Sequence, residues 1–309
     1  MSNRLAAIDI GSNSVRLLTC RRDQTGLVER SKQVNTTRLA KGVDQTGRLA
    51  EPNIIQTIAV LKDYATQLAE LGIKNCSVFA TSAVRDAANS DDFLARVKAE
   101  TGFNITILSG QQEAAYGFLG VVKGNSRPAD KILVIDVGGG STELIFGDQS
   151  GAIEYSDSFD IGAVRMTERF GLTHAMQPAQ YKAVESELFK QLQSKNLSHY
   201  KGAALCCIAI GGTATSLAAI DLQLPAYDAE AIQRHQMTQT ALAELTGRLV
   251  AATRAEKLNM AGLAAGRVDI ISAGALIING VMRYFEQPTL YFSDYDNLEG
   301  SLQSERIDG

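Results

Sequence analysis

The sequence is poor in the residues that build zinc sites and disulfide frameworks. Its 309 residues include only three histidines and four cysteines. The cysteines form no CxxC pair, and the histidines are scattered without the spacing of a zinc site. We therefore expect reduced cysteines, most of them buried in strands, and no zinc centre.

The sequence also lacks an excess of positive charge. Lysine and arginine together number 30 against 34 acidic residues, which gives a net charge of −4. Broad nucleic-acid binding normally needs a basic surface, so we expect no nucleic-acid partner. A polyanionic substrate would need a local basic patch or a metal ion.

Long apolar stretches are missing as well. No run approaches the roughly 18 apolar residues of a transmembrane helix. The first residues, Met1–Arg4, lead straight into an apolar segment and lack the features of a signal peptide. The sequence therefore predicts no membrane association and a cytoplasmic location.

The length and an internal repeat indicate two domains. At about 150 residues per domain, 309 residues suggest two. The apolar runs Leu5–Ile10 and Val15–Cys20 flank a glycine turn, and Lys131–Val137 and Glu143–Phe146 flank a second one. This repetition predicts a duplicated α/β domain, with residues 123–130 as the linker.

The other elements are predicted from hydrophobic periodicity and turn residues. We expect residues 38–48, which contain two glycines, to form a loop. The predicted helices span 52–71, 91–101, 178–193, 238–253 and 269–284, with another starting at 109 and one at 211, and the further strands span 27–34, 75–80, 105–108, 205–210 and 289–292.

The two glycine turns carry the strongest chemical signal. They read Asp9-Ile-Gly-Ser-Asn-Ser14 and Asp136-Val-Gly-Gly-Gly-Ser-Thr142. Glycines and small hydroxyl residues let successive backbone N–H groups approach an anion. A single aspartate in such a turn often bonds only the nearby backbone. Two matched turns instead favour one shared ligand, a phosphate with Mg²⁺ bound to carboxylates.

The setting of these turns excludes two common phosphate motifs. Each turn joins two strands, whereas the P-loop and the dinucleotide fingerprint open a helix. Neither GxxxxGK[ST] nor GxGxxG occurs in the sequence. The chemistry therefore differs from that of P-loop and Rossmann proteins.

Several further candidates are ambiguous when taken singly. Glu143 is either a surface carboxylate at a strand start, or a metal ligand or water-orienting group. Gly211–Thr213 precedes a helix whose N-terminus would favour an anion, although many α/β loops look similar. Arg85 and Arg165 have the forked geometry that suits phosphate, but for either one taken alone a surface salt bridge is the better explanation.

Glu113 is the candidate for the group that orients water. It lies in the first turn of the helix that begins after Ser109, where a carboxylate can simply offset the helix dipole. Ser109 and Gln112 fit a capping box, so Gln112 already fills the capping role. Glu113 can then face a cleft and act as a base, a role typically worth about 10²–10⁴ in rate.

Seven segments, in order along the chain, resemble the exopolyphosphatase/guanosine pentaphosphate phosphohydrolase (Ppx/GppA) family. The family pattern extends to about residue 300. The matching segments are Ala7–Leu17, Ala80–Asn89, Leu108–Ala115, Ile135–Leu144, Gly162–Arg165, Ile210–Thr213 and Gly266–Ile270.

The resemblance implies an α/β protein of the actin-like (ASKHA) class. Two ribonuclease-H-like domains would flank an interdomain cleft. We assign residues 1–123 to the first domain, with the tail 298–309 as a candidate to pack back on it, and 124–297 to the second. The implied activity is removal of terminal phosphate from inorganic polyphosphate, conversion of pppGpp to ppGpp, or both, with Mg²⁺ or another divalent cation. A homodimer is one assembly it allows.

The matching positions also imply roles for individual residues. They are catalytic roles for Glu113 and Arg85; phosphate binding by Gly11, Ser12, Asn13, Ser14, Gly138, Gly139, Gly140, Ser141, Thr142, Gly211, Gly212, Thr213, Arg165 and Arg267; and metal binding by Asp9, Asp136 and Glu143.

The sequence departs from the family pattern in two ways. The usual Ser-Asp-x-Gly-Leu-Arg-Glu-Gly reads Ser293-Asp-Tyr-Asp-Asn-Leu-Glu-Gly300, so Leu298 replaces an arginine. One positive group would then be missing, which favours weaker phosphate binding or lower activity. The chain also has no room for the C-terminal helical domains of longer members, so we expect no extended channel for very long chains.

Two other functions stay open on the sequence. One is a kinase of the same superfamily that moves phosphate from ATP to a small acceptor. The other is a sensor that binds a nucleotide or polyphosphate with little turnover, as the replaced arginine suggests.

Overall fold

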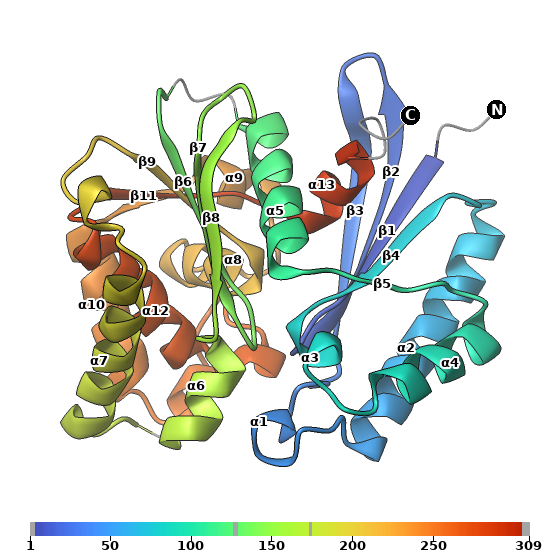
Figure 1. Ribbon diagram of the computed structural model, residues 1–309, viewed down its shortest axis with the longest axis horizontal. Helices are drawn as coiled ribbons and strands as arrows, with labels where there is room; N and C mark the ends of the chain where they lie inside the picture. The colour runs from blue at the N-terminus through green and yellow to red at the C-terminus, as the bar shows by residue number, and fades with distance from the viewer. Residues whose placement is uncertain (1–3, 126–128, 173–174, 305–309) are drawn as a thin grey trace. The chain divides into compact units, whose positions relative to one another are not determined.

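The computed structural model describes residues 4–125, 129–172 and 175–304. The chain divides into two compact units, with Met1–Gly120 and Asn297–Gly309 in unit 1 and Val121–Asp296 in unit 2 (Figure 1). The sequence-based boundary, between residues 123 and 124, lies at the end of helix α5 (Gly110–Gly124). The predicted linker includes residues 126–128, which lie outside the described part of the chain.

Unit 1 is built on a five-stranded sheet in the order β3-β2-β1-β4-β5. Strand β2 is antiparallel to both neighbours, and β4 and β5 run parallel to β1. This is the strand order of a ribonuclease-H-like domain. The strands are β1 (Arg4–Ile10), β2 (Ser14–Asp23), β3 (Gly26–Thr36), β4 (Cys76–Ala80) and β5 (Thr106–Ile107).

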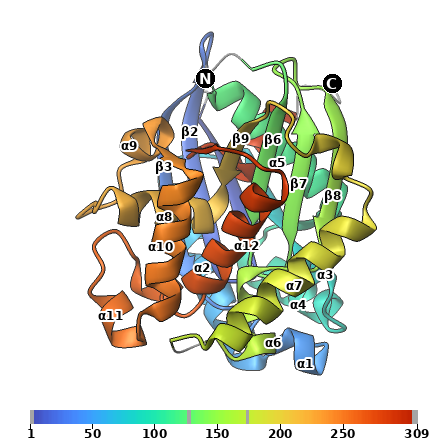
Figure 2. The same cartoon turned by 90° about the vertical axis from the view of Figure 1, so that its left-hand side faces the viewer.

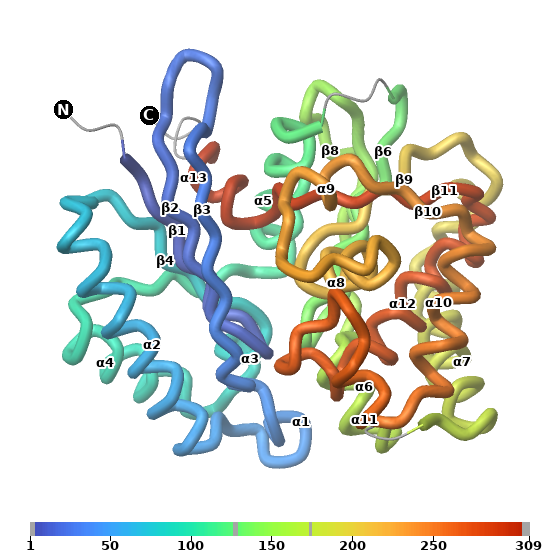
Figure 3. The backbone as a smooth tube through the Cα atoms, turned by 180° about the vertical axis from the view of Figure 1, so that it is seen from behind, coloured from blue at the N-terminus to red at the C-terminus, as the bar shows by residue number. Residues whose placement is uncertain are grey.

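Helices cover both faces of this sheet, because successive side chains of its strands point to opposite faces and apolar residues occur on both. Ile8 and Leu17 belong to the buried cluster formed with α2 (Glu51–Glu70) and α4 (Ser90–Thr101), which lie side by side (Figures 1 and 3). Leu18 belongs to the cluster on the other face, which includes residues of α13. The remaining helices of unit 1 are α1 (Val43–Thr46), α3 (Ser82–Arg85), α5 and α13 (Asn297–Ser304).

Unit 2 repeats the same sheet and adds one strand. Its order is β10-β11-β9-β6-β7-β8. Strand β7 is antiparallel to β6 and β8, whereas β9 and β11 run parallel to β6. The duplicated order confirms the predicted actin-like fold class; the cleft stays a prediction. The strands are β6 (Ile132–Val137), β7 (Thr142–Gly147), β8 (Ile153–Phe159), β9 (Cys206–Ile210), β10 (Gln236–Thr238) and β11 (Thr289–Phe292).

The almost wholly buried helix α12 (Ile271–Tyr284) organises the packing of unit 2. It packs on β6 and on the helices α6, α7, α8 and α10, of which α7 and α10 flank it in Figure 2. The other helices are α6 (Ala163–Phe170), α7 (Pro178–Ser194), α8 (Gly211–Asp221), α9 (Ala229–Arg234), α10 (Gln239–Ala251) and α11 (Arg254–Leu258), with short 3₁₀ turns at Ser198–Tyr200 and Ala265–Arg267.

One predicted loop contains a helix. Segment 38–48 forms the single helical turn α1, which the left-handed residues Gly42 and Gly47 bound at φ 79° and 65°. Glycine adopts such angles without steric cost. Gly42 therefore lies just before the helix and Gly47 just after it, and the residues between them form one helical turn. The prediction of loop was wrong for these four residues.

The four cysteines are free, as expected, and Cys20 and Cys207 are buried. Burial, with Glu299 nearby, raises the pKa of Cys20 to about 11. Across the described residues, no helix is both long and apolar enough to cross a membrane.

Candidate active site

The first turn, Gly11–Asn13, joins β1 to β2. The Gly11 N–H donates to the carbonyl of Ser14 at 3.1 Å and closes the turn. The Ser12 carbonyl accepts from Ala40 N and the Asn13 carbonyl from residues 37 and 38, at 2.9–3.1 Å. In the described chain the N–H groups of Ser12 and Asn13 donate to no protein atom, and Asn13 Nδ2 is buried without an acceptor. These donors suit an anion.

Asp9, just before this turn, is held by an arginine that the sequence analysis did not single out. Arg16 lies directly opposite Asp9 in the β1–β2 ladder. Its Nε donates to Asp9 Oδ2 at 3.0 Å, and its Nη2 contacts the same oxygen. The signal was present in the sequence, because Asp9 and Arg16 lie one residue beyond the pair Ile10 and Val15 that closes the turn, and so face each other in the antiparallel pair.

The second turn, Gly138–Ser141, repeats this geometry. The Gly138 N–H donates to the Ser141 carbonyl at 3.0 Å. The turn carbonyls accept from the start of α6: Gly138 from Ala163 N at 2.8 Å, and Gly139 from Arg165 N at 3.1 Å. Within the described residues the N–H groups of 139–141 donate to no protein atom. These N–H groups, like those of the first turn, suit an anion.

Gly162 makes this docking possible. A Cβ at Gly162 would lie 2.2 Å from the Gly139 carbonyl oxygen. The backbone of α6 therefore touches the backbone of the turn, and Gly162–Arg165, predicted from sequence, lies against turn 2. The Arg165 side chain approaches Asp160 only at 3.9 Å.

Two carboxylates face each other at the second turn. Asp136 and Glu143 are directly opposite in the β6–β7 ladder, and both are buried. Ser158 Oγ donates to Glu143 Oε1 at 2.6 Å. The position that carries Arg16 in unit 1 therefore carries an acid in unit 2, so the two turns differ in charge.

The start of α8 lies beside Asp136. Gly211 has φ +77°, and a Cβ there would be 2.6 Å from Asp136 Oδ1. A Cβ on Gly212 would meet the guanidinium of Arg267, and Thr213 Oγ1 donates to the Val137 carbonyl at 2.9 Å. Unit 2 therefore brings Asp136, the Gly211–Thr213 helix start and Arg267 together.

Glu113 and Arg85 meet in unit 1. Ser109 and Gln112 form the predicted capping box, with hydrogen bonds of 2.9 and 3.2 Å. Glu113 is buried one residue further, and Arg85 Nη1 lies 3.4 Å from its Oε2 and 2.8 Å from the Leu108 carbonyl. Arg85 thus fixes the carboxylate of Glu113.

The three predicted metal ligands lie in different units, Asp9 in unit 1 and Asp136 and Glu143 in unit 2. Among the described residues, no group of three or more His, Cys, Asp or Glu side chains could hold a metal ion. Mg²⁺ in phosphoryl-transfer sites needs only one or two carboxylates, since water and phosphate oxygens complete its shell. The buried pair Asp136 and Glu143 fits this requirement.

Leu298, the residue in place of the family's arginine, lies in unit 1. It is fully buried in the apolar cluster on the α13 face, together with Leu18 and Phe79. The expectation that a positive group is missing from the site at this position stays a prediction.

Comparison with known proteins gives a consistent family signal. The model of the Ppx/GppA phosphatase family matches residues 20–306. Exopolyphosphatase 2 of Mycobacterium tuberculosis is 33% identical over 96% of this chain and 97% of its own length. A bifunctional 3-dehydroquinate synthase/phosphatase of Fusobacterium nucleatum is 32% identical, but the chain spans only 46% of that protein. A Ppx/GppA family crystal structure from Aquifex aeolicus matches with a TM-score of 0.82 and 31% identity, over 99% of this chain and 98% of the other.

Proposed function

The chain belongs to the Ppx/GppA phosphatase family, and on that premise we propose that it hydrolyses the terminal phosphoanhydride bond of inorganic polyphosphate and releases orthophosphate. The observation that carries the proposal is the duplicated turn, whose N–H groups without a protein acceptor in the described residues suit phosphate oxygens. The similarity to an exopolyphosphatase over nearly its full length supports the substrate class.

The proposed site uses Mg²⁺ held by Asp136 and Glu143. Their opposed, buried carboxylates supply hard oxygen ligands, and the side chain that glycine lacks at 211 leaves room beside Asp136. Bound there, the cation would neutralise charge on the phosphates. Asp9, predicted from sequence as a third ligand, already shares one oxygen with Arg16.

Phosphate binding and the orientation of water would use the protein's own groups. The N–H groups of both turns and Asn13 Nδ2 would hold the phosphoryl oxygens, where fixed donors stabilise charge without reorganisation. Glu113 would orient the attacking water, and Arg85 would hold the Glu113 carboxylate in place through the contact at 3.4 Å.

We propose pppGpp as a second substrate. The same motifs that resemble the Ppx/GppA family also imply conversion of pppGpp to ppGpp. Its terminal phosphoanhydride bond is chemically equivalent to that of polyphosphate. We propose initial rates of phosphate release from polyphosphate, pppGpp and ATP, measured side by side with Mg²⁺, as the deciding experiment. Release from polyphosphate supports the proposal, transfer from ATP to an acceptor would favour a kinase, and binding without turnover would favour a sensor.

Glu113→Gln tests the mechanism. The amide keeps the size of the side chain but cannot accept a proton, so kcat should fall by at least about 10²-fold with little change in thermal stability. Glu100→Gln is the matched control, since Glu100 is another helical glutamate in an ion pair, with Lys62 at 2.6 Å. Wild-type turnover in the Glu113 variant would exclude this residue as the base.

A further inference from the structure

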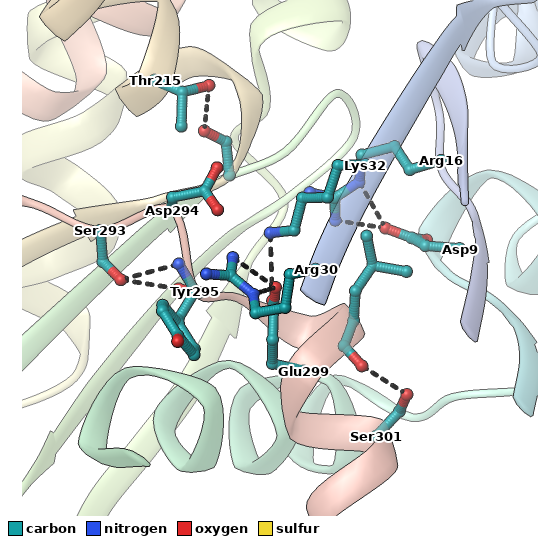
Figure 4. Close-up of polar contacts among 12 residues, drawn as sticks. Asp9, Arg16, Arg30, Lys32, Thr215, Ser293, Asp294, Tyr295, Glu299 and Ser301 are labelled. Carbon is teal, nitrogen blue, oxygen red and sulfur yellow. Dashed lines mark hydrogen bonds and ion pairs between the residues drawn. The ribbon is translucent and has the colours of Figure 1, made fainter. Parts of the chain in front are cut away.

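A hydroxyl of helix α3 reaches the first turn. Ser82, the first residue of α3, lies in the segment Ala80–Asn89 but was predicted to have no role in the site. Its Oγ lies 3.1 Å from the Oγ of Ser12, and the two residues are only 3% and 4% exposed. The first turn is therefore held at two places, because Arg16 also binds Asp9 at its start (Figure 4).

The two hydroxyl groups carry two protons but share one hydrogen bond. Either oxygen can be the donor of that bond, which uses one of the protons. Among the described residues, neither side chain makes a second hydrogen bond. The other proton therefore has no acceptor in this part of the protein, and a buried donor without an acceptor costs free energy. The pair of Ser12 and Ser82 suits one further acceptor, such as a phosphate oxygen.

Unit 2 shows that the fold does not require this pair. Thr213 is the counterpart of Ser82, since each lies three residues beyond the residue that pairs with the aspartate before the turn. Thr213 Oγ1 donates to the backbone carbonyl of Val137 at 2.9 Å. The position of Ser12 is occupied by Gly139. The same turn thus forms in unit 2 without two bonded hydroxyl groups, so the pair in unit 1 serves a purpose other than closing the turn.

The opposite end of α3 contacts the candidate base. Arg85, its last residue, places Nη1 3.4 Å from Oε2 of Glu113. One helical turn therefore connects two parts of the proposed site within unit 1, the first turn through Ser82 and the water-orienting carboxylate through Arg85. This arrangement fixes the spacing between the phosphate donors of the first turn and Glu113.

We propose that Ser82 is a positioning residue for phosphate: its hydroxyl donates to Ser12 Oγ, and the Ser12 hydroxyl donates to a phosphoryl oxygen of the substrate. The inference rests on the proposed function. An anion at the first turn attracts the Ser12 proton, which leaves Ser82 as the donor within the pair. A hydroxyl that accepts one hydrogen bond is also a stronger donor in the next. Ser82 therefore acts on the substrate through Ser12.

Ser82→Ala tests this relay through kinetics. We expect kcat/KM for tripolyphosphate to fall about three- to tenfold, the effect of one neutral hydrogen bond, with little change in melting temperature. In a Ser12→Ala background the same substitution should change kcat/KM less than about twofold, because the two residues act as a unit. Ser272→Ala is the matched control. Its buried Oγ donates to the Leu249 carbonyl at 2.8 Å in unit 2, so its loss should lower the melting temperature and spare kcat/KM.

Binding measurements separate this inference from the proposed function. Dissociation constants for tripolyphosphate with Mg²⁺ are measured by calorimetry on Glu113→Gln protein, with and without Ser82→Ala. We expect binding to weaken about three- to tenfold. Unchanged binding would overturn the inference, as would an equal loss of kcat/KM when Ser82→Ala is added to Ser12→Ala. If wild-type protein binds tripolyphosphate in a Ser82-dependent way but releases no phosphate, the proposed function fails while the role of Ser82 stands.

Discussion

At the scale of single residues, Leu298 shows how burial decides the effect of a charge. The side chain is fully buried among apolar groups of unit 1. An arginine there would lose its hydration among apolar side chains. We expect Leu298→Arg to destabilise the protein by about 3 kcal/mol or more, whereas Leu298→Met should cost less than about 1.5 kcal/mol. Chemical denaturation of both variants measures this, and an arginine variant of wild-type stability would contradict it.

The buried charge of Lys257 lowers the stability of the protein in a pH-dependent way. It is only 1% exposed, and burial lowers its pKa from 10.5, partly offset by the nearby Asp269. Between the lowered pKa and 10.5 the unfolded chain binds more protons, so stability rises with pH across that window. Lys257→Met should stabilise the protein on the order of 1 kcal/mol at neutral pH, and its advantage should shrink as the pH approaches 10.5. Urea denaturation of both proteins over this range tests it; a constant difference would refute the assignment.

The individual roles of site residues were partly predictable. The capping box of Ser109 and Gln112 was predicted correctly, because capping depends on neighbours in sequence, whereas the catalytic role of Glu113 stays a prediction. Arg16 was missed, although strand pairing across a short turn places it opposite Asp9. Contacts such as that of Gly212 with Arg267 join distant segments and need the tertiary structure.

At the scale of elements, the contact of α6 with turn 2 depends on one missing side chain. Because the atoms nearest Gly162 are backbone atoms of the turn, an added methyl group cannot be accommodated by a rotamer change. We expect Gly162→Ala to cost about 1–3 kcal/mol and to lower phosphate release at least tenfold. Gly247→Ala is the control: nothing lies within 4 Å of its added Cβ, and it should gain about 0.5–1 kcal/mol in its helix. Equal effects of both changes would exclude a special role for Gly162.

The long periodic elements were predicted well, and the short ones were not. Helices α2 and α7 have prolines at their starts and clear apolar faces. Helices α9 and α11 have six and five residues, too few for a period to emerge. Strand β8 lacks a buried alternation, since six of its seven residues keep some exposure. Their formation depends on neighbours that the sequence pattern does not identify.

At the scale of the whole molecule, unit 1 is discontinuous in sequence. Its last helix, α13, contributes Leu298 and Leu302 to the apolar cluster on one sheet face. Truncation after Asp296 should therefore accelerate amide hydrogen exchange in β1, β2 and α5 and leave β6 and β7 protected. Exchange measured by mass spectrometry on the full and shortened chains tests this. Uniform acceleration in both units would show that they unfold together.

The duplication was readable from the sequence because each repeat opens with the same strand, turn and strand. The return of the C-terminal helix to unit 1 could be anticipated only as a candidate, since no local pattern distinguishes it. Strand order within each unit depends on parallel pairings between segments far apart in sequence, which came from the resemblance and not from periodicity.

The split of unit 1 also has a consequence for synthesis on the ribosome. Domains generally fold in order of their emergence, beginning with the N-terminal one. Here unit 1 lacks α13, and with it the cover of one sheet face, until all of unit 2 has been synthesised. Unit 2 is contiguous and can close earlier. The apolar face of nascent unit 1 therefore stays uncovered while unit 2 is synthesised. During this interval chaperone binding or aggregation would compete with folding.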